Sequence, residues 1–461
     1  MERLIGGTEM QLGLLPLFKD VPHTREDLTK IIDKLIDANN QTQFYGIASR
    51  HDEAKICSRL FNGGLFYSDL GHLEYATPEC KNLADFPAYE FAGRRIAESL
   101  LTLIYVGKRK VYSFFSNNTD YQYTSDSINT FAYHENYKSR VAKGKIKELL
   151  PFLATRQIFA GSGMVIPAQF RTNPLGRMGY SLSQRGLATW LQLQDNSVKV
   201  GQHSLAVGEN RHIKNVLHIT LGDANVSDYT IKLKIGTTAL VNQLLEDGWQ
   251  MPGFLELAPD QAVRSIQEIA LYPNFDNFRK WYVNTGRYTT SAIDVQRIYM
   301  EAATRYMGRD EDTDWTLLNW DLTLNQLEQD PMSANKLDWV IKKRLIDKLK
   351  AKGFSEQELI RVDIGYHAAD LERSIFRLVG NNDTTDRQIS DAINYAPLNT
   401  RAAGRALILK AIAQDRQFTK DKGVLPKINW HSITYRDHVL DMYEPGKTYL
   451  YESQRFIRKF R

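Results

Sequence analysis

The order of apolar and polar positions at the start of the chain indicates a strand followed by a helix. Residues 3–13 alternate enough to predict a first strand. Thr24 followed by Asp27 resembles a capping box that opens a helix. The apolar residues of this helix fall on one face, namely Leu28, Ile31, Ile32, Leu35 and Ile36. The chain therefore begins with a strand and an amphipathic helix.

The same alternation continues, less regularly, up to residue 115. We predict a strand near 65–69, a helix over 88–104 and a β-rich run at 110–115 that leads into a polar turn. Strands that alternate with helices in this way indicate a mixed sheet with helices packed on it.

Helices dominate the later part of the chain. Apolar spacing predicts a long helix from Asp223 to Gly248 and a succession of helices over 292–395. The helical pattern pauses at Pro397, and a basic, aromatic-containing segment follows. We therefore predict a fold of the α+β class, with a large domain over residues 1–395 and a small C-terminal domain over residues 396–461.

Composition and charge fit an ordinary soluble globular protein. Of 461 residues, 43% are hydrophobic and 25% are charged. The formal charge of +5 is too small to indicate nucleic-acid binding. Only two cysteines occur and the N-terminus has no signal-peptide pattern, so we expect a cytoplasmic protein with neither a nucleic-acid nor a membrane partner.

Oxygen-bearing side chains gather in the first part of the chain. Tyr67 and Asp69 should share one face of a strand, with Glu74 shortly after them. Glu9 on the first strand is their natural partner, because Mg²⁺ prefers carboxylate oxygens and nucleotide phosphates. Acidic clusters are common on surfaces, so a solvated polar edge of the sheet is the alternative explanation.

Four further residues are candidates for phosphate or metal contacts. His134 and His218 could serve as ligands, although a lone histidine is more often a structural side chain. Arg156 and Arg185 could pair with phosphate oxygens, but arginines on such segments are about as often structural. The Gly-Ser-Gly run at 161–163 lacks the continuation of a phosphate-binding loop, so we interpret it as a turn.

Nine motifs in one order closely resemble the family of Pup ligases (PafA) and Pup deamidases or depupylases (Dop). They are GGTEMQLG (6–13), FYSDLGHLEYATPEC (66–80), SNNTD (116–120), HENY (134–137), LLPFLATRQ (149–157), SLSQR (181–185), LHITLGDAN (217–225), LKIGTTALV (233–241) and LDWVIKKRL (337–345). The resemblance implies a fold similar to glutamine synthetase, in which a large domain with a curved antiparallel sheet and packed helices cradles ATP beside a small C-terminal domain.

The resemblance also implies a role for each matching residue. Glu9, Tyr67 and Glu74 correspond to magnesium ligands, and Asp69 to the catalytic aspartate. His134 and His218 correspond to further metal or phosphate contacts of the cofactor site, and Arg156 and Arg185 to supporting residues of that site.

By resemblance, the reaction is an ATP- and Mg²⁺-dependent ligation. ATP would phosphorylate the C-terminal glutamate of a disordered Pup-like tag, and Asp69 would act as base on the lysine amine of a target protein. The alternatives are a depupylase or deamidase of the same family, a non-catalytic homologue, and a small-molecule carboxylate–amine ligase. Clustered carboxylates argue against a non-catalytic homologue, because they repel one another without a cation.

The chain departs from the family pattern at two places. Gln11 stands where the pattern has a second glutamate two residues after Glu9. Over residues 195–215 the chain lacks the Arg-Asp-Glu-Pro-His-type segment of the family, and Asn215 and Val216 replace the basic pair that usually precedes the Leu-His motif. The long insertion that depupylases carry before their aspartate motif is short or absent here, which favours a ligase slightly. Other motifs, such as the start at Thr8 and the spacing from Asp69 to His72, are more like a depupylase.

Overall fold

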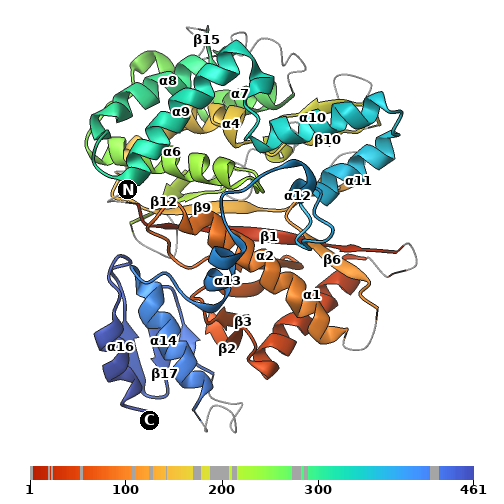
Figure 1. Cartoon of the computed structure of the whole chain (residues 1–461). Coiled ribbons are helices and arrows are strands. Elements are labelled where there is room, and N and C mark those ends of the chain that lie inside the picture. The colour runs from red at the N-terminus through yellow and green to blue at the C-terminus, as the bar shows by residue number, and fades with distance from the viewer. Residues whose placement is uncertain are drawn as a thin grey trace. The chain divides into compact units, whose positions relative to one another are not determined.

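The computed structural model shows two compact units, each built from separate stretches of sequence (Figure 1). We call Ile5–Ser116 with Thr384–Arg461 the terminal unit, and Met1–Leu4 with Asn117–Asp383 the central unit. The structure describes residues 4–18, 21, 24–51, 55–105, 109–123, 128–141, 143–169, 178–186, 207–209, 215–271, 282–284, 289–415 and 425–460. The predicted division between residues 395 and 396 stays a prediction.

The terminal unit is built on a largely antiparallel sheet. Its strands follow the order β1 (Gly6–Pro16), β5 (His72–Ala76), β4 (Leu65–Asp69), β3 (Lys55–Leu60), β2 (Gly46–His51), β16 (Lys427–Ile428), β17 (Ser432–Tyr435) and β18 (His438–Asp441). Strand β6 (Tyr112–Phe115) pairs with β1. Among the described strand pairs of this unit, β16 with β2 is parallel and the others are antiparallel. The last segment of the chain therefore extends a sheet begun by the first.

One face of this sheet is covered by helices α1 (Arg25–Thr42) and α2 (Asp85–Ile104). Strand alternation directs the buried apolar residues to this face, namely Met10, Leu12, Phe66, Leu73 and Tyr75. Helix α2 lies so close that a Cβ atom on Gly93 would be 2.1 Å from the Tyr75 ring. Asn39 of α1 donates to the Ser58 hydroxyl at 2.6 Å. The opposite face of strands β1, β5 and β4 carries polar side chains, among them Gln11 and Glu74.

Residues at the end of the chain complete the core of this unit. Helices α14 (Arg401–Ala413) and α16 (Leu450–Ile457) pack with Ile47 of β2 in one apolar cluster. Helix α13 (Asp386–Asn394) packs on α2. Arg59 donates to the carbonyl oxygen of Ile428 at 2.9 Å, which ties β3 to β16.

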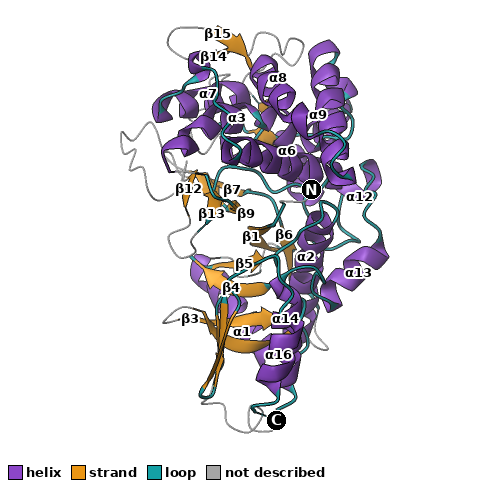
Figure 2. Ribbon diagram, turned by 90° about the vertical axis from the view of Figure 1, so that its left-hand side faces the viewer, coloured by secondary structure: helices purple, strands orange, loops and turns teal. Residues whose placement is uncertain are grey.

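The central unit combines short strands with many helices (Figure 2). Strands β12 (Val207–Glu209), β13 (Val216–Ile219) and β9 (Tyr133–Lys138) pair in that order, all antiparallel. Three further pairs are β7 (Thr119–Tyr123) with β8 (Ile128–Thr130), β10 (Met164–Ile166) with β11 (Gly179–Ser181), and β14 (Tyr282–Asn284) with β15 (Thr289–Ser291).

The helices of the central unit enclose an aromatic core. They are α3 (Leu150–Thr155), α4 (Gln157–Ala160), α6 (Asp228–Glu246), α7 (Pro259–Leu271), α8 (Ala292–Ala303), α9 (Glu311–Gln329), α10 (Asp338–Ala351), α11 (Glu356–Tyr366) and α12 (Phe376–Val379). Trp320 of α9 lies against Phe152 of α3, with ring centroids 6.0 Å apart. Within the described residues, no helix is both long and apolar enough to cross a lipid bilayer.

Most elements predicted from the sequence are confirmed. Thr24 caps α1 by accepting a hydrogen bond from the Asp27 amide, and the strand predicted at 65–69 is β4. The helix predicted over 88–104 begins earlier, at Asp85. The helix predicted from Asp223 begins only at Asp228, because Ser227 is its N-cap.

Candidate functional site

Six polar side chains lie on the face of strands β1, β5 and β4 that is opposite the one covered by α1 and α2. In register, Gln11 lies opposite Glu74, Glu74 opposite Tyr67, and Asp69 opposite His72. Glu9 precedes Gln11 by two positions and so points to the same side. The sheet therefore brings together the four residues of this unit that the sequence predicted for metal binding and catalysis, namely Glu9, Tyr67, Asp69 and Glu74.

Hydrogen bonds connect these side chains in pairs. The Gln11 amide nitrogen donates to the Asp69 carboxylate at 2.9 Å, and the Tyr67 hydroxyl donates to the Glu74 carboxylate. Burial raises the pKa of Tyr67 well above its usual value, and the negative charges of Glu74 and Glu9 raise it further. The phenol thus keeps its proton and holds Glu74 in place.

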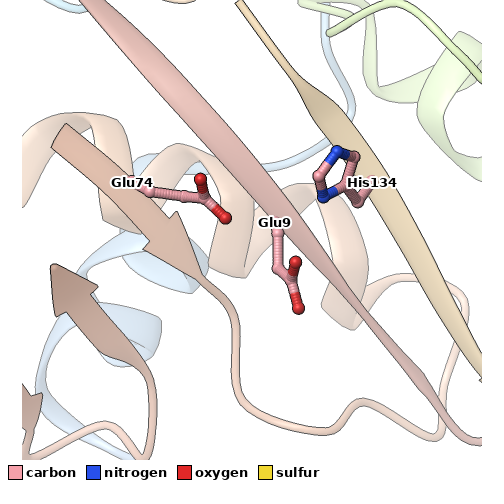
Figure 3. Close-up of side chains that lie close together, drawn as sticks. All are labelled: Glu9, Glu74 and His134. Carbon is pink, nitrogen blue, oxygen red and sulfur yellow. The ribbon is translucent and has the colours of Figure 1, made fainter. Parts of the chain in front are cut away.

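Glu9 and Glu74 form a donor set that fits a divalent cation. A carboxylate oxygen of each lies within 4.8 Å of the other. Two oxygens bound to one Mg²⁺ at about 2.1 Å can lie up to about 4.2 Å apart, so a small adjustment suffices. Figure 3 draws Glu9 on β1 and Glu74 on β5, together with His134, which belongs to the central unit. Glu74 is 2% exposed, so an unpaired charge there would be costly.

A tight turn between β4 and β5 follows directly after Asp69. Leu70 and Gly71 both have positive φ angles, of 48° and 85°, which matches the right-handed twist of a two-residue hairpin. The Arg25 guanidinium of α1 donates to the Leu70 carbonyl oxygen at 2.6 Å. The position of Asp69 is therefore fixed from the helix side as well as from the sheet.

His72 closes the hairpin opposite Asp69. Burial and the nearby Arg25 charge lower the pKa of His72 to about 4, although Asp69 acts in the opposite direction. The imidazole is thus neutral near pH 7. It adds a polar group to the face without adding a positive charge.

In the central unit, His134 and His218 lie side by side on β9 and β13. Their ring centroids are 5.0 Å apart. The Nδ1 atom of His218 lies 2.8 Å from the Asn136 side-chain oxygen, which orients its ring. The two histidines predicted to contact metal or phosphate are therefore neighbours. Their role stays a prediction.

Arg156 is held by protein groups deep in the central unit. Its guanidinium pairs with both carboxylate oxygens of Glu135, at 2.9 and 2.5 Å, and donates to the carbonyl oxygen of Leu221 at 2.6 Å. The residue is 2% exposed. These contacts fit a supporting residue that fixes β9, which carries His134, against the segment after β13.

Asp223 is the centre of a second buried network, which positions Arg185. Its carboxylate accepts hydrogen bonds from the backbone amides of Ser162, Gln184 and Arg185, at 2.9, 3.0 and 3.0 Å. The Arg185 guanidinium donates to the carbonyl oxygen of Phe131 at 2.9 Å. Burial lowers the pKa of Arg185, and Asp223 counteracts this effect.

The structure also reveals residues that the sequence reasoning missed. Gln11, noticed only as a departure from the family pattern, is the partner of Asp69. Glu135 pairs with Arg156, and Asp223 accepts a hydrogen bond from the Arg185 amide. The only sequence signals were that Glu135 follows His134 and that Asp223 comes after an apolar strand. Of the divergent segment 195–215, only β12 and Asn215 lie within the described residues.

Comparison with known proteins identifies relatives along nearly the whole chain. The sequence model described as Pup-ligase protein matches residues 33–434. A Pup–protein ligase of Renibacterium salmoninarum is 29% identical over 450 residues, which cover 91% of this chain and 91% of the relative. A Pup–protein ligase of Actinosynnema mirum is 32% identical over 393 residues, which cover 78% of this chain and 82% of the relative.

Solved structures give the same result for the fold. The ligase PafA in its crystal structure with Pup matches with a TM-score of 0.80 and 27% identity, over 100% of this chain and 91% of that one. PafA in complex with ADP matches with a TM-score of 0.75 and 26% identity, over 97% of each chain. The α+β fold and the resemblance predicted from the motifs are confirmed, and the chain belongs to the Pup-ligase protein family.

Proposed function

We propose that this chain uses ATP and Mg²⁺ to join the γ-carboxylate of a Pup-like tag's C-terminal glutamate to a lysine amine of a target protein. The product is an isopeptide bond, and a γ-glutamyl phosphate is the intermediate. The observation that carries this proposal is the placement of Asp69 beside Glu74, Tyr67 and Gln11 on one sheet face. Family membership supports it, as do relatives named for this activity.

Each type of side chain at the candidate site has a distinct task in this scheme. Glu9, Glu74 and the protonated Tyr67 would hold Mg²⁺, which supplies charge neutralisation for the nucleotide's phosphates. His134 and His218 would contact metal or phosphate, while Arg156 and Arg185 support the segments around them. ATP is the expected nucleotide, since a related PafA was solved with ADP.

Asp69 would act in the second half of the reaction. A lysine amine has a pKa near 10.4 and carries a proton at neutral pH, so it must lose that proton to attack the phosphorylated glutamate. A carboxylate positioned to accept the proton satisfies this requirement. The phosphorylation half needs nucleotide and metal only, so the two halves should be separable by mutation.

The same family supports the proposed partners, and the state of the cysteines supports the proposed location. A related PafA was solved with Pup, which supports a disordered Pup-like tag as the partner here, and lysine-bearing proteins as acceptors. Cys57 and Cys80 are buried thiols that form no disulfide, which fits the expected cytoplasmic location. The small C-terminal domain over residues 396–461 stays part of this proposal.

The first test is the variant Asp69→Asn. We expect ATP binding to persist, because the metal-binding carboxylates are unchanged. Conjugation to lysine should fall by roughly a hundredfold or more, the usual contribution of a positioned general base. A gel assay of tag transfer, run beside calorimetry with a non-hydrolysable ATP analogue, measures both. Near wild-type conjugation would make Asp69 structural, and a loss of ATP binding would assign it to the metal site.

A depupylase of the same family is the second candidate. Between Thr42 at the end of α1 and Leu65 at the start of β4, the chain forms the paired strands β2 and β3. This short connection leaves no room for the long insertion expected of depupylases, and it favours the ligase. The same gel assay decides between them when a purified conjugate is supplied, because a depupylase would release the tag faster than it attaches it.

A further inference from the structure

Gln11 is placed to control the orientation of the Asp69 side chain. The residue is 5% exposed and lies within β1, opposite Glu74 of β5. Its amide nitrogen reaches the Asp69 carboxylate on β4, the next strand but one, at 2.9 Å. An ionised carboxylate can only accept hydrogen bonds, so the amide must be the donor. The contact therefore has a definite direction.

The chemistry of an amide matters at this position. A carboxylate in place of the Gln11 amide would set one acceptor against another and repel Asp69. The amide of Gln11 instead donates to Asp69 and holds its carboxylate.

We propose that Gln11 is a positioning residue, which holds the Asp69 carboxylate where it can accept the proton of the attacking lysine amine. This inference rests on the proposed role of Asp69. In the step concerned, the amine nitrogen bonds to the γ-carbonyl carbon of the phosphorylated glutamate. The bond from that carbon to the phosphate oxygen breaks, and phosphate leaves with the bonding electrons. The proton released by nitrogen goes to Asp69.

Two contacts position Asp69. Gln11 binds the side chain itself, whereas Arg25 holds the backbone of the next residue through the Leu70 carbonyl oxygen. Without the amide, Asp69 keeps its backbone anchor but its carboxylate loses the hydrogen bond from Gln11. Small losses of orientation slow a proton transfer strongly, since the donor and acceptor must meet at hydrogen-bond distance.

The variant Gln11→Leu tests the inference with two acceptors. One is a protein rich in exposed lysines, and the other is hydroxylamine, which is largely unprotonated at neutral pH and needs no base. We expect lysine conjugation to fall roughly tenfold or more, and hydroxamate formation to stay within about twofold of wild type. Gln11→Glu should lower lysine conjugation at least as far, because the new carboxylate repels Asp69.

Gln296→Leu is the matched control. Gln296 is a fully buried glutamine of α8 whose amide donates to the Phe152 carbonyl oxygen at 2.9 Å. It has no bond to the residues of the candidate site among the described contacts. Its replacement should change the stability but leave the ratio of the two acceptor rates unchanged.

A double-mutant cycle separates this inference from the proposed function. In the Asp69→Asn background, Gln11→Leu should cause no further loss, because Gln11 acts through Asp69. The positioning role would be overturned if the two substitutions reduced the conjugation rate by independent factors that multiply in the double variant. It would also be overturned if Gln11→Leu reduced hydroxamate formation as much as lysine conjugation. If Asp69→Asn impairs conjugation but Gln11→Leu does not, only this inference fails. If Asp69→Asn has no effect, both fail.

Discussion

Glu9 and Glu74 bring two carboxylates within 4.8 Å of each other on one sheet face. Such a pair repels unless a cation lies between the oxygens. We predict that Glu9→Gln weakens binding of a magnesium–ATP analogue tenfold or more, on the order of 1.4 kcal/mol. Calorimetry measures this. Glu26→Gln, which changes only an exposed pair with Lys30 on α1, is the control. Unchanged affinity would remove Glu9 from the metal site.

Alternation along a strand was sufficient to predict which of these residues share a face. Tyr67 and Asp69 are two positions apart, so any strand at 65–69 directs them to the same side. The contact of Gln11 with Asp69 was beyond such reasoning, because it requires the strand order β1, β5, β4. Likewise, the pairing of Arg156 with Glu135 joins residues whose relation depends on how two elements pack. Local patterns carry no information about either.

The hairpin that joins β4 to β5 is the element on which Asp69 depends. Gly71 has a φ of 85°, and a Cβ atom there would lie 2.6 Å from the Thr29 hydroxyl of α1. We predict that Gly71→Ala lowers the free energy of unfolding by about 1–2 kcal/mol and slows conjugation. Strain in the turn and the crowding of Thr29 would both displace Asp69. Thermal unfolding and the gel assay measure the two effects.

Gly248→Ala is the control for this change. Gly248 also has a φ of 85°, but nothing lies within 4 Å of the place where its Cβ atom would be. Its replacement should cost stability through backbone strain alone and leave conjugation intact. Equal activity of the two variants would show that the hairpin tolerates displacement. Thr29→Ala combined with Gly71→Ala should restore part of the lost activity, because it removes the crowded hydroxyl.

Elements with strong local signals were predicted well, and those without were not. Helix α1 has an N-cap and an apolar face, so its start at Arg25 was clear from the sequence. Strands β16, β17 and β18 were missed because each has at most four residues, too few for a clear periodic signal. The start of α6 was predicted too early at Asp223, because apolar spacing does not locate an N-cap, and the Asp223 carboxylate instead accepts hydrogen bonds from the amides of Ser162, Gln184 and Arg185.

On the scale of the whole molecule, the terminal unit joins the two ends of the sequence. Strand β16 pairs with β2, and the cluster around Ile47 is filled by residues of α14 and α16. A pause in the helical pattern at Pro397 suggested a boundary, but no local feature indicated that the last segment adds to the first sheet. Contacts between residues more than three hundred positions apart leave no periodic signal in a single sequence.

Glu79 connects the first and last segments of the terminal unit through ion pairs with α14. Its carboxylate accepts a hydrogen bond from Arg401 of α14 at 2.6 Å and pairs with Arg405 of the same helix. Burial alone would raise the pKa of Glu79, but the two guanidinium groups outweigh it and lower the pKa to about 2, from its usual 4.5. Because the folded state holds the ionised form more tightly, this interaction stabilises the fold above about pH 4.5. Its contribution is lost as the pH falls toward 2.

We therefore predict that Glu79→Gln destabilises the protein by about 3 kcal/mol at pH 7, through two buried guanidinium groups left without their counter-ion. The difference between wild type and variant should shrink as the pH falls below 4.5, because Glu79 of the unfolded wild type then takes up a proton, while the folded protein keeps the ionised form down to about pH 2. Urea unfolding at pH 7 and pH 3.5 measures this. Glu452→Gln, in the exposed pair with Lys447, should cost less than about 1 kcal/mol at either pH. A constant difference across this range would mean that packing of the side chain, and not its charge, holds the end of the chain to the sheet.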